Sequence, residues 1–286
     1  MAFKTVLCVT EVDHSNQDVR IAASLCAEVA ARLSVLVIKF ALRRPIDAVS
    51  TGWLECKQDM LGLQRRSAET LSHDLARLEH RCREIHTLLE GMWVPCDIDT
   101  DYSDRACVGD VVRQRALCAD LTVIGPSLLN DDDLGPLAID GSLFESGKPV
   151  LLVPNGVKAS LRPRRILVGW DSRVETSRVV RQALHLLSGA AHVRVTLIDP
   201  EATGNGPESE IDIAAFLAQQ GIRVVVDRLP TPVQPVTTAL ARHAIDTSAD
   251  MVVLGACGHR RLRERIFGGV TRWITGEPPL PLLVAR

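Results

Sequence analysis

The chain has 286 residues, of which 46% are hydrophobic, and its formal charge at pH 7 is −2. This length and apolar content are enough for two domains with buried cores. A near-neutral charge argues against a general nucleic-acid-binding protein, which would be strongly basic. Because no apolar run approaches the length of a membrane span, we also expect no membrane partner.

The start of the chain and its cysteines bear on localisation. The first residues lead directly into a strand-like segment, residues 5–9, which leaves no room for a signal peptide. The eight cysteines are scattered and lack the Cys-x-x-Cys or Cys/His spacing of a zinc site. Such cysteines are typical of reduced thiols, so we expect a cytoplasmic protein without a bound metal.

One sequence pattern occurs twice along the chain. Three pairs of segments correspond: 5–9 with 165–169, 119–125 with 249–255, and 149–153 with 281–285. This repeat predicts one domain at residues 1–157 and a second at residues 158–286. Within each domain, strand-like and helical segments alternate, which predicts an open, mostly parallel sheet with helices on both faces.

The first copy contains a helical insert around residues 53–90. Leu7 and Gly125 are 118 positions apart, whereas the corresponding Leu167 and Gly255 are 88 apart. One apolar stripe at helical spacing runs through the insert: Leu71, Leu75, Leu78, Cys82 and Ile85. The stripe fits a helix that covers its own domain's sheet or one that binds a partner, and we expect the first.

The second copy contains a glycine-rich stretch after the buried strand predicted at residues 251–254. Gly255 and Gly258 allow a sharp turn and a close approach of the backbone to a ligand. Gly268 and Gly269 precede a predicted helix, whose first N–H groups favour an anion. The stretch therefore predicts a phosphate-binding loop, with a tight turn that binds nothing as the alternative.

The charged residues of the second copy favour the binding of an anion. Three basic or titratable side chains follow the second glycine: His259, Arg260 and Arg261. Residues 1–157 contain 16 basic and 23 acidic residues, a net charge of −7, whereas residues 158–286 contain 17 and 12, a net charge of +5. The domain with the glycine-rich stretch is thus the one whose field attracts anions.

The spacing Gly-x2-Gly-x9-Gly after a strand resembles the nucleotide-binding signature of the universal stress protein family. The string GACGHRRLRERIFGGVTRWI is similar to the C-terminal half of bacterial tandem members. The resemblance covers nearly the whole chain and implies two three-layer α/β/α domains, packed as a pseudo-dimer through their last strands. One position departs from the signature, because Gly269 replaces the usual Ser or Thr, and Thr271 lies two residues further on.

The resemblance also implies a ligand, ATP or a related adenine nucleotide with Mg as its counter-ion, and the residues that bind it. Asp171 would contact the ribose and the backbone of Leu197 or Ile198 the adenine. The phosphates would lie on the loop and helix start: Gly255, Gly258, Gly268, Gly269, Val270 and Thr271. By its position alone, Asp171 fits an N-terminal helix cap equally well.

The first copy departs from this signature. Its strand ends in Gly125-Pro126-Ser127-Leu128, without a second glycine at the required spacing, and residues 131–133 are all aspartate. Asp13 is a candidate counterpart of Asp171. We therefore expect a degenerate copy that binds no nucleotide and serves structure or partner contact.

No motif of a dinucleotide dehydrogenase, a P-loop enzyme or a serine hydrolase is present. The sequence therefore predicts a regulatory stress-response protein with at most slow ATP hydrolysis, which forms an internal pseudo-dimer and could pair further as a homodimer. Two alternatives stay open: a nucleotide-free scaffold, and a weak ATP hydrolase or phosphotransferase.

Overall fold

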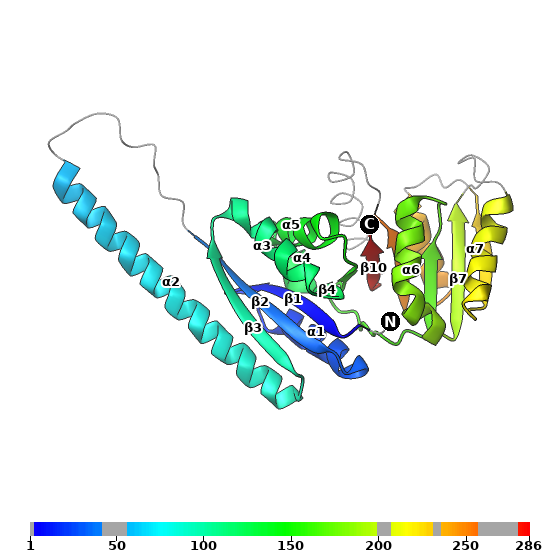
Figure 1. Cartoon of the computed structure of the whole chain (residues 1–286), viewed down its shortest axis with the longest axis horizontal. Helices are drawn as coiled ribbons and strands as arrows, with labels where there is room; N and C mark the ends of the chain where they lie inside the picture. Colours follow the sequence, from blue (N-terminus) through cyan, green and yellow to red (C-terminus); the bar gives the residue numbers. More distant parts are fainter. Residues whose placement is uncertain (1–2, 42–55, 199–206, 231–235, 257–279) are drawn as a thin grey trace.

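A computed structural model describes residues 3–41, 56–198, 207–230, 236–256 and 280–286 (Figure 1). In this part of the chain, ten strands form one sheet in the order β3-β2-β1-β4-β5-β10-β9-β6-β7-β8. The strands are β1 (Thr5–Glu11), β2 (Arg32–Phe40), β3 (Cys96–Ser103), β4 (Leu121–Ile124), β5 (Val150–Leu152), β6 (Arg165–Gly169), β7 (His192–Ile198), β8 (Val224–Leu229), β9 (Met251–Gly255) and β10 (Leu282–Ala285).

Helices cover both faces of this sheet. The helices packed on one face are α1 (Gln17–Val29), α2 (Cys56–Met92), α6 (Val174–Gly189) and α7 (Pro207–Gln219). Those on the other face are α3 (Arg105–Leu117), α4 (Pro126–Leu129), α5 (Leu134–Ile139) and α8 (Val236–Asp246), with a π-helical turn at Asp140–Glu145. The predicted open α/β fold with three layers is confirmed. None of the described helices combines the length and apolar character that a membrane crossing requires.

The inner strands, such as β1, β4, β5 and β10, are mostly apolar because both of their faces are covered, whereas the outermost strands β3 and β8 carry charged residues. In β1, Val6 and Cys8 point into one core, and Leu7 and Val9 point into the other; all four are fully buried. This alternation follows from the two-residue period of a strand, so a continuous apolar run contributes to two cores at once.

The two halves of the chain join through their last strands. β5 and β10 are antiparallel, with Leu151 opposite Leu283, whereas every other described strand pair is parallel. Leu151 and Leu283 lie in one core and Leu152 and Leu282 in the other, so both cores run across the join. The expected pairing of the last strands is confirmed. The boundary between residues 157 and 158 stays a prediction.

Helix α2 confirms the predicted helical insert, but the sheet covers only part of its apolar stripe. Leu78 and Ile85 are buried, while Leu71 and Leu75 are 41% and 44% exposed. In Figure 1 the N-terminal part of α2 extends away from the sheet, which explains this difference. The expectation that the stripe covers its own sheet is therefore right only for the C-terminal half of the helix.

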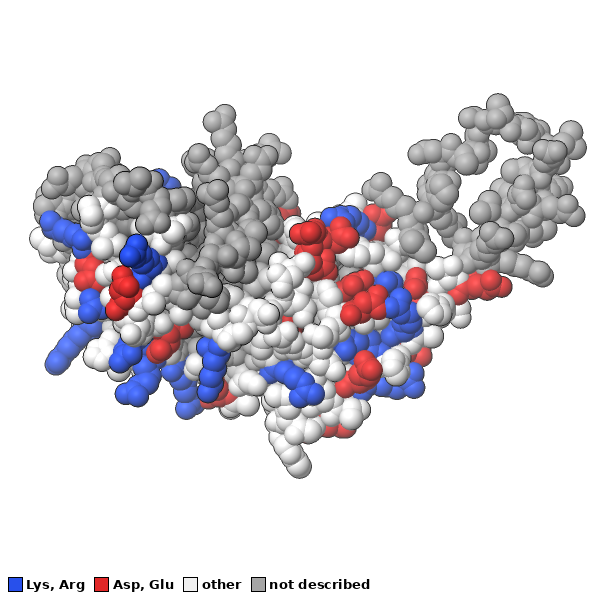
Figure 2. Space-filling model, turned by 180° about the vertical axis from the view of Figure 1, so that it is seen from behind, with Lys and Arg blue, Asp and Glu red and all other residues white. Residues whose placement is uncertain are grey.

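Basic side chains gather on one edge of the second half. Figure 2 shows Lys and Arg along the lower side of that half, at left in this view. Figure 1 places the beginning of β7 on the same lower side. The carboxyl ends of the parallel strands, where the sequence predicts the nucleotide, lie on the opposite side.

Replacing a side chain at the join tests its contribution to stability. Leu283→Ala removes a fully buried side chain from β10 and should lower the free energy of unfolding by about 2–5 kcal/mol. Val174→Ala, at a position 62% exposed, is the control and should change it by less than about 0.5 kcal/mol. Urea denaturation followed by circular dichroism measures both, and equal effects would contradict a central role for this pairing.

Candidate functional site

The carboxyl ends of β9, β6 and β7, which are neighbours in the sheet, bring three of the predicted site residues to one edge. Gly255 is the last residue of β9, and Asp171 follows β6 by two residues. Leu197 lies near the end of β7 with its side chain buried in the core. Leu197 therefore has only its backbone available for a ligand at this edge, as the predicted adenine contact requires.

Thr176, in the first turn of α6, connects Asp171 with Gly255. Its side chain is 2% exposed, and its hydroxyl donates a hydrogen bond to Asp171 Oδ1. The backbone N–H of Arg173 donates to the same carboxylate oxygen at 3.1 Å. The cap residue of α6 is Arg173, without a side-chain cap hydrogen bond, so Asp171 is not the N-terminal cap that its position allowed. Its carboxylate instead connects the segment before α6 to the first turn of the helix. Its contact with a ribose stays a prediction.

Position 255 requires a glycine because the end of β9 lies very close to the start of α6. A Cβ on this residue would lie 2.6 Å from the backbone nitrogen of Thr176 and 2.8 Å from its Cα. Both atoms belong to the backbone, so no side-chain rotation could relieve the overlap. The sequence analysis assigned Gly255 to ligand access, and the structure gives it a packing reason as well.

The remaining predicted positions of the phosphate loop lie outside the described residues. They are Gly258, His259, Arg260, Arg261, Gly268, Gly269, Val270 and Thr271, and the side chain of Ile198 is likewise not described. Their roles stay predictions. The described part of the predicted site therefore consists of Asp171, Gly255 and the β7 backbone at Leu197, together with Thr176, which the sequence analysis missed.

In the first half, a carboxylate of the protein occupies the corresponding edge. Asp18, in the first turn of α1, is fully buried and accepts hydrogen bonds from the backbone N–H groups of Ser127 and Leu128, both at 2.9 Å. A Cβ at Gly125 would lie 2.5 Å from Asp18 Cγ, just as one at Gly255 would meet Thr176. The loop that corresponds to the phosphate loop thus binds an internal anion.

Sequence analysis missed Asp18 and considered Asp13 instead. Asp13 is about half exposed and pairs with Arg77 and Lys39. Counted along the matched strands β1 and β6, the position of Asp171 corresponds to Glu11. Counted back from Asp18 and Thr176, which meet the two matched glycines, it corresponds to Asp13. The correspondence of Asp13 with Asp171 therefore stays a prediction. The one available signal for Asp18 was an acidic residue in the first turn of a predicted helix.

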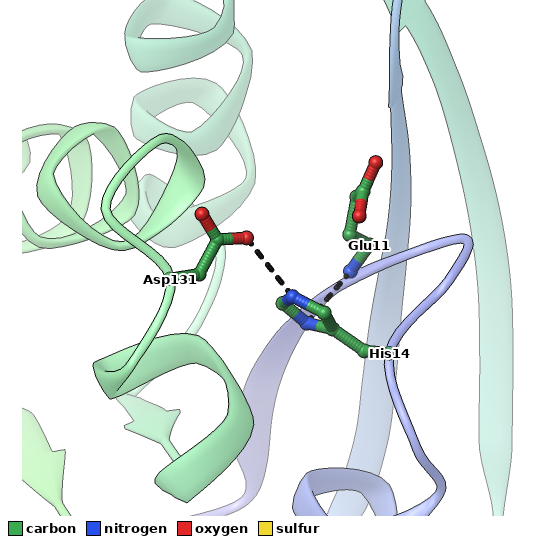
Figure 3. Close-up of side chains that lie close together, drawn as sticks. All are labelled: Glu11, His14 and Asp131. Atoms are coloured by element: carbon green, nitrogen blue, oxygen red, sulfur yellow. Dashed lines mark hydrogen bonds and ion pairs between the residues drawn. The ribbon is translucent and has the colours of Figure 1, made fainter.

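Asp131 belongs to a second polar cluster at this edge (Figure 3). Asp131 Oδ2 lies 2.9 Å from His14 Nε2, and the backbone N–H of Glu11 donates to His14 Nδ1 at 3.3 Å. Candidate ligand atoms of Glu11, His14 and Asp131 all lie within 4.8 Å of one another, close enough to hold a metal ion.

The hydrogen bonds of this cluster do not suit a metal. Because His14 Nδ1 accepts a hydrogen bond from a backbone N–H, the ring N–H is at Nε2, which donates a hydrogen bond to Asp131. Neither nitrogen then has a free lone pair for a metal. Lys39 Nζ also lies 3.7 Å from Glu11 Oε1, where its charge opposes a cation. The cluster thus links the segment after β1 to the segment between α4 and α5.

Removal of the internal carboxylate tests its role. Asp18→Ala leaves the N–H groups of Ser127 and Leu128 without their acceptor and should lower the free energy of unfolding by about 1–3 kcal/mol. Asp18→Asn keeps the shape and one acceptor oxygen, so its loss should be smaller. Chemical denaturation of the three proteins checks this order, and an Asp18→Ala protein as stable as the parent would contradict it.

The packing of Gly255 gives a separate prediction. Gly255→Ala should lower the free energy of unfolding by about 1–3 kcal/mol, because its Cβ overlaps the backbone of Thr176. Gly91→Ala is the matched control, since Gly91 lies in α2 with nothing within 4 Å of an added Cβ. The control should gain about 0.5–1 kcal/mol from the helix preference of alanine. A gain for both variants in thermal denaturation would rule out the close approach.

The second half of the chain matches one family of known proteins. Residues 163–286 match the model of the Universal stress protein family. No curated protein sequence is detectably similar to the chain. The matched segment includes Asp171, Gly255 and the whole glycine-rich stretch.

Solved structures resemble the chain over its full length. A universal stress protein from Archaeoglobus fulgidus DSM 4304 is similar with a TM-score of 0.65 at 16% identity, over 99% of this chain and 96% of that one. A putative universal stress protein from Pseudomonas aeruginosa UCBPP-PA14 has a TM-score of 0.56 at 16% identity, over 99% and 93%. At these identities the similarity establishes the fold alone.

Proposed function

Because residues 163–286 are a domain of the universal stress protein family, we propose that this domain binds ATP or a related adenine nucleotide at the carboxyl edge of β9, β6 and β7. One observation carries the proposal. Asp171 and Gly255, which are 84 positions apart in the sequence, both contact or closely approach Thr176 at the start of α6. The proposed ribose position and the beginning of the proposed phosphate loop are therefore neighbours.

The orientation of the nucleotide follows from this arrangement. The ribose would lie near Asp171 and the adenine near the β7 backbone at Leu197 and Ile198, which are the neighbouring strand ends. The phosphates would extend over the end of β9 towards the glycine-rich stretch, with Mg as their counter-ion. The net charge of +5 for residues 158–286 favours an anion in this half.

We propose no nucleotide in the first half. There the two N–H groups that follow Gly125 already bind the carboxylate of Asp18, and a phosphate would have to displace it. Asp131 adds negative charge at the same edge. The first half would then stabilise the second through the joined sheet and offer surface to partners.

The family and fold support a stress-response role, and we propose a regulatory, cytoplasmic protein. The six described cysteines outside the uncertain segments are all free, as expected of a reducing compartment. Burial raises the pKa of Cys26 to about 12, so this thiol stays protonated and unreactive at neutral pH. No catalytic group is assigned, so the proposal includes at most slow hydrolysis of the bound ATP.

Two measurements test nucleotide binding. Mass spectrometry identifies small molecules released from the denatured protein, and calorimetric titration measures the binding of ATP with and without Mg. Gly258→Val and Gly268→Val should remove most of the binding, because a branched side chain would block the approach of the phosphates. Arg261→Ala should weaken binding by no more than about 1 kcal/mol, the usual contribution of an exposed charge.

Circular dichroism should confirm that each variant is folded. Two outcomes would overturn the proposal. One is the absence of both released nucleotide and binding heat, which would favour the nucleotide-free scaffold. The other is a folded Gly258→Val protein that binds ATP normally while Arg261→Ala does not.

A further inference from the structure

A cleft of about 490 Å³ lies at the amino ends of β6, β7 and β8, the edge opposite the proposed nucleotide site. Its lining includes four residues that carry or can carry positive charge: Arg165, His192, Arg194 and Arg223. The volume lies in the range of about 300–1,000 Å³ that small-molecule sites occupy. From Arg165 to Gly169, β6 spans about 13 Å at 3.3 Å per residue, so the two edges are separate places.

Three of these side chains have no partner in the described part of the chain. Arg165, His192 and Arg223 are exposed, and their side chains make no hydrogen bond or ion pair with another described residue. Asp250 lines an adjoining hollow with Arg165 and His192, but its Oδ2 accepts from the backbone N–H groups of residues 164 and 165, both at 2.9 Å. The guanidinium groups of Arg165 and Arg223 and the imidazole of His192 are thus available to a ligand.

The fourth side chain is already neutralised. Arg194 donates to both carboxylate oxygens of Asp227, at 3.0 and 2.9 Å, and His243 Nε2 lies 2.9 Å from Asp227 Oδ2. Although partial burial opposes ionisation of Asp227, the hydrogen bonds from His243 and Arg194 hold its pKa below the usual value. Asp227 is therefore a carboxylate at neutral pH, and Arg194 borders the cleft as one half of an ion pair.

The first half provides an internal comparison. The matched pairing of β1 with β2 and of β6 with β7 makes Thr5 the counterpart of Arg165, and Arg32 that of His192. The pairing of the next strands makes Asp97 the counterpart of Val225.

In the first half, Asp97 accepts a hydrogen bond from Arg32 Nε at 2.7 Å and another from Ser34 Oγ at 2.8 Å. Arg32, the only cation among the three matched positions of the first half, is therefore paired with the carboxylate of Asp97. In the second half, an arginine replaces Thr5 and a valine replaces the carboxylate. At these positions the second half thus has an arginine and a histidine, and it lacks the carboxylate that pairs with Arg32 in the first half.

Val225 also defines what kind of anion fits. Val225 is 52% exposed and belongs to the lining of the cleft, together with the buried residues Leu167, Val193 and Ala249. An inorganic anion would leave this apolar surface in water, and a neutral apolar compound would leave the cations unpaired. A ligand that joins a charged group to an apolar body satisfies both.

We propose that this cleft binds a small organic anion in which a carboxylate or phosphate group is attached to an apolar body. The charged group lies among Arg165, His192 and Arg223, and the apolar body covers Val225. This site is additional to the proposed nucleotide site and does not depend on it.

Octanoate is the probe, because it joins a carboxylate to an aliphatic chain. Acetate has the charge without the apolar body, and octanol has the apolar body without the charge. In a magnetic resonance titration of the full chain, octanoate should bind at least about ten-fold more tightly than either compound. Saturating ATP should leave its affinity unchanged, because the two edges are separate.

Two variants test the residues. Val225→Asp introduces the carboxylate that the first half has at Asp97 and should weaken octanoate binding at least about ten-fold. Arg223→Gln removes one cation at an exposed position, where folding is not at risk, and should weaken binding about three-fold or more. Arg178→Gln, which changes an exposed arginine of α6 outside the cleft, is the matched control and should bind as the parent does.

Three results would overturn the proposal. The first is equal affinity for octanoate, acetate and octanol. The second is unchanged octanoate binding by both Val225→Asp and Arg223→Gln. The third is binding of an acidic polymer such as polyglutamate without binding of octanoate, which would make the edge a surface for acidic macromolecules.

Discussion

The antiparallel pairing of β5 with β10 is the interaction on which the rest of the structure depends. Each half alone would end in a short strand of valine and leucine with unpaired backbone groups, which is a template for aggregation. Pairing the two strands satisfies these groups and continues both hydrophobic cores from one half into the other. One chain thereby obtains an arrangement that two separate copies would otherwise have to form by association.

The two halves share a fold but differ in the carboxylates that they place at the two edges of the sheet. The first half supplies its own carboxylates: Asp18 binds the loop after β4 at the carboxyl edge, and Asp97 neutralises Arg32 at the amino edge. The second half has Thr176 and Val225 at the matched places. Both proposals made for the second half follow from this difference, since an anion from solution can take a place that no internal carboxylate fills.

Sequence patterns predicted the fold well because periodicity and repetition are local properties. The apolar runs of β1 and β9, the repeated segments and the pairing of the last strands were all predicted and agree with the structure. The amphipathic spacing also predicted α2. It could not predict that Leu71 and Leu75 would be exposed, because the length of a helix relative to the sheet beneath it depends on the packed structure.

The sequence by itself determined the fold class, the two copies and the positions Asp171, Leu197 and Gly255 at one edge. Only the tertiary structure decided which side chains meet there. Asp18 and Ser127 are 109 positions apart, and His14 and Asp131 are 117 apart, so no periodicity or motif relates them. The roles of Thr176 and Val225 likewise depend on the strand or helix that packs beside each of them. Contacts between distant segments arise when a sheet brings its strand ends together, and a linear pattern does not contain that information.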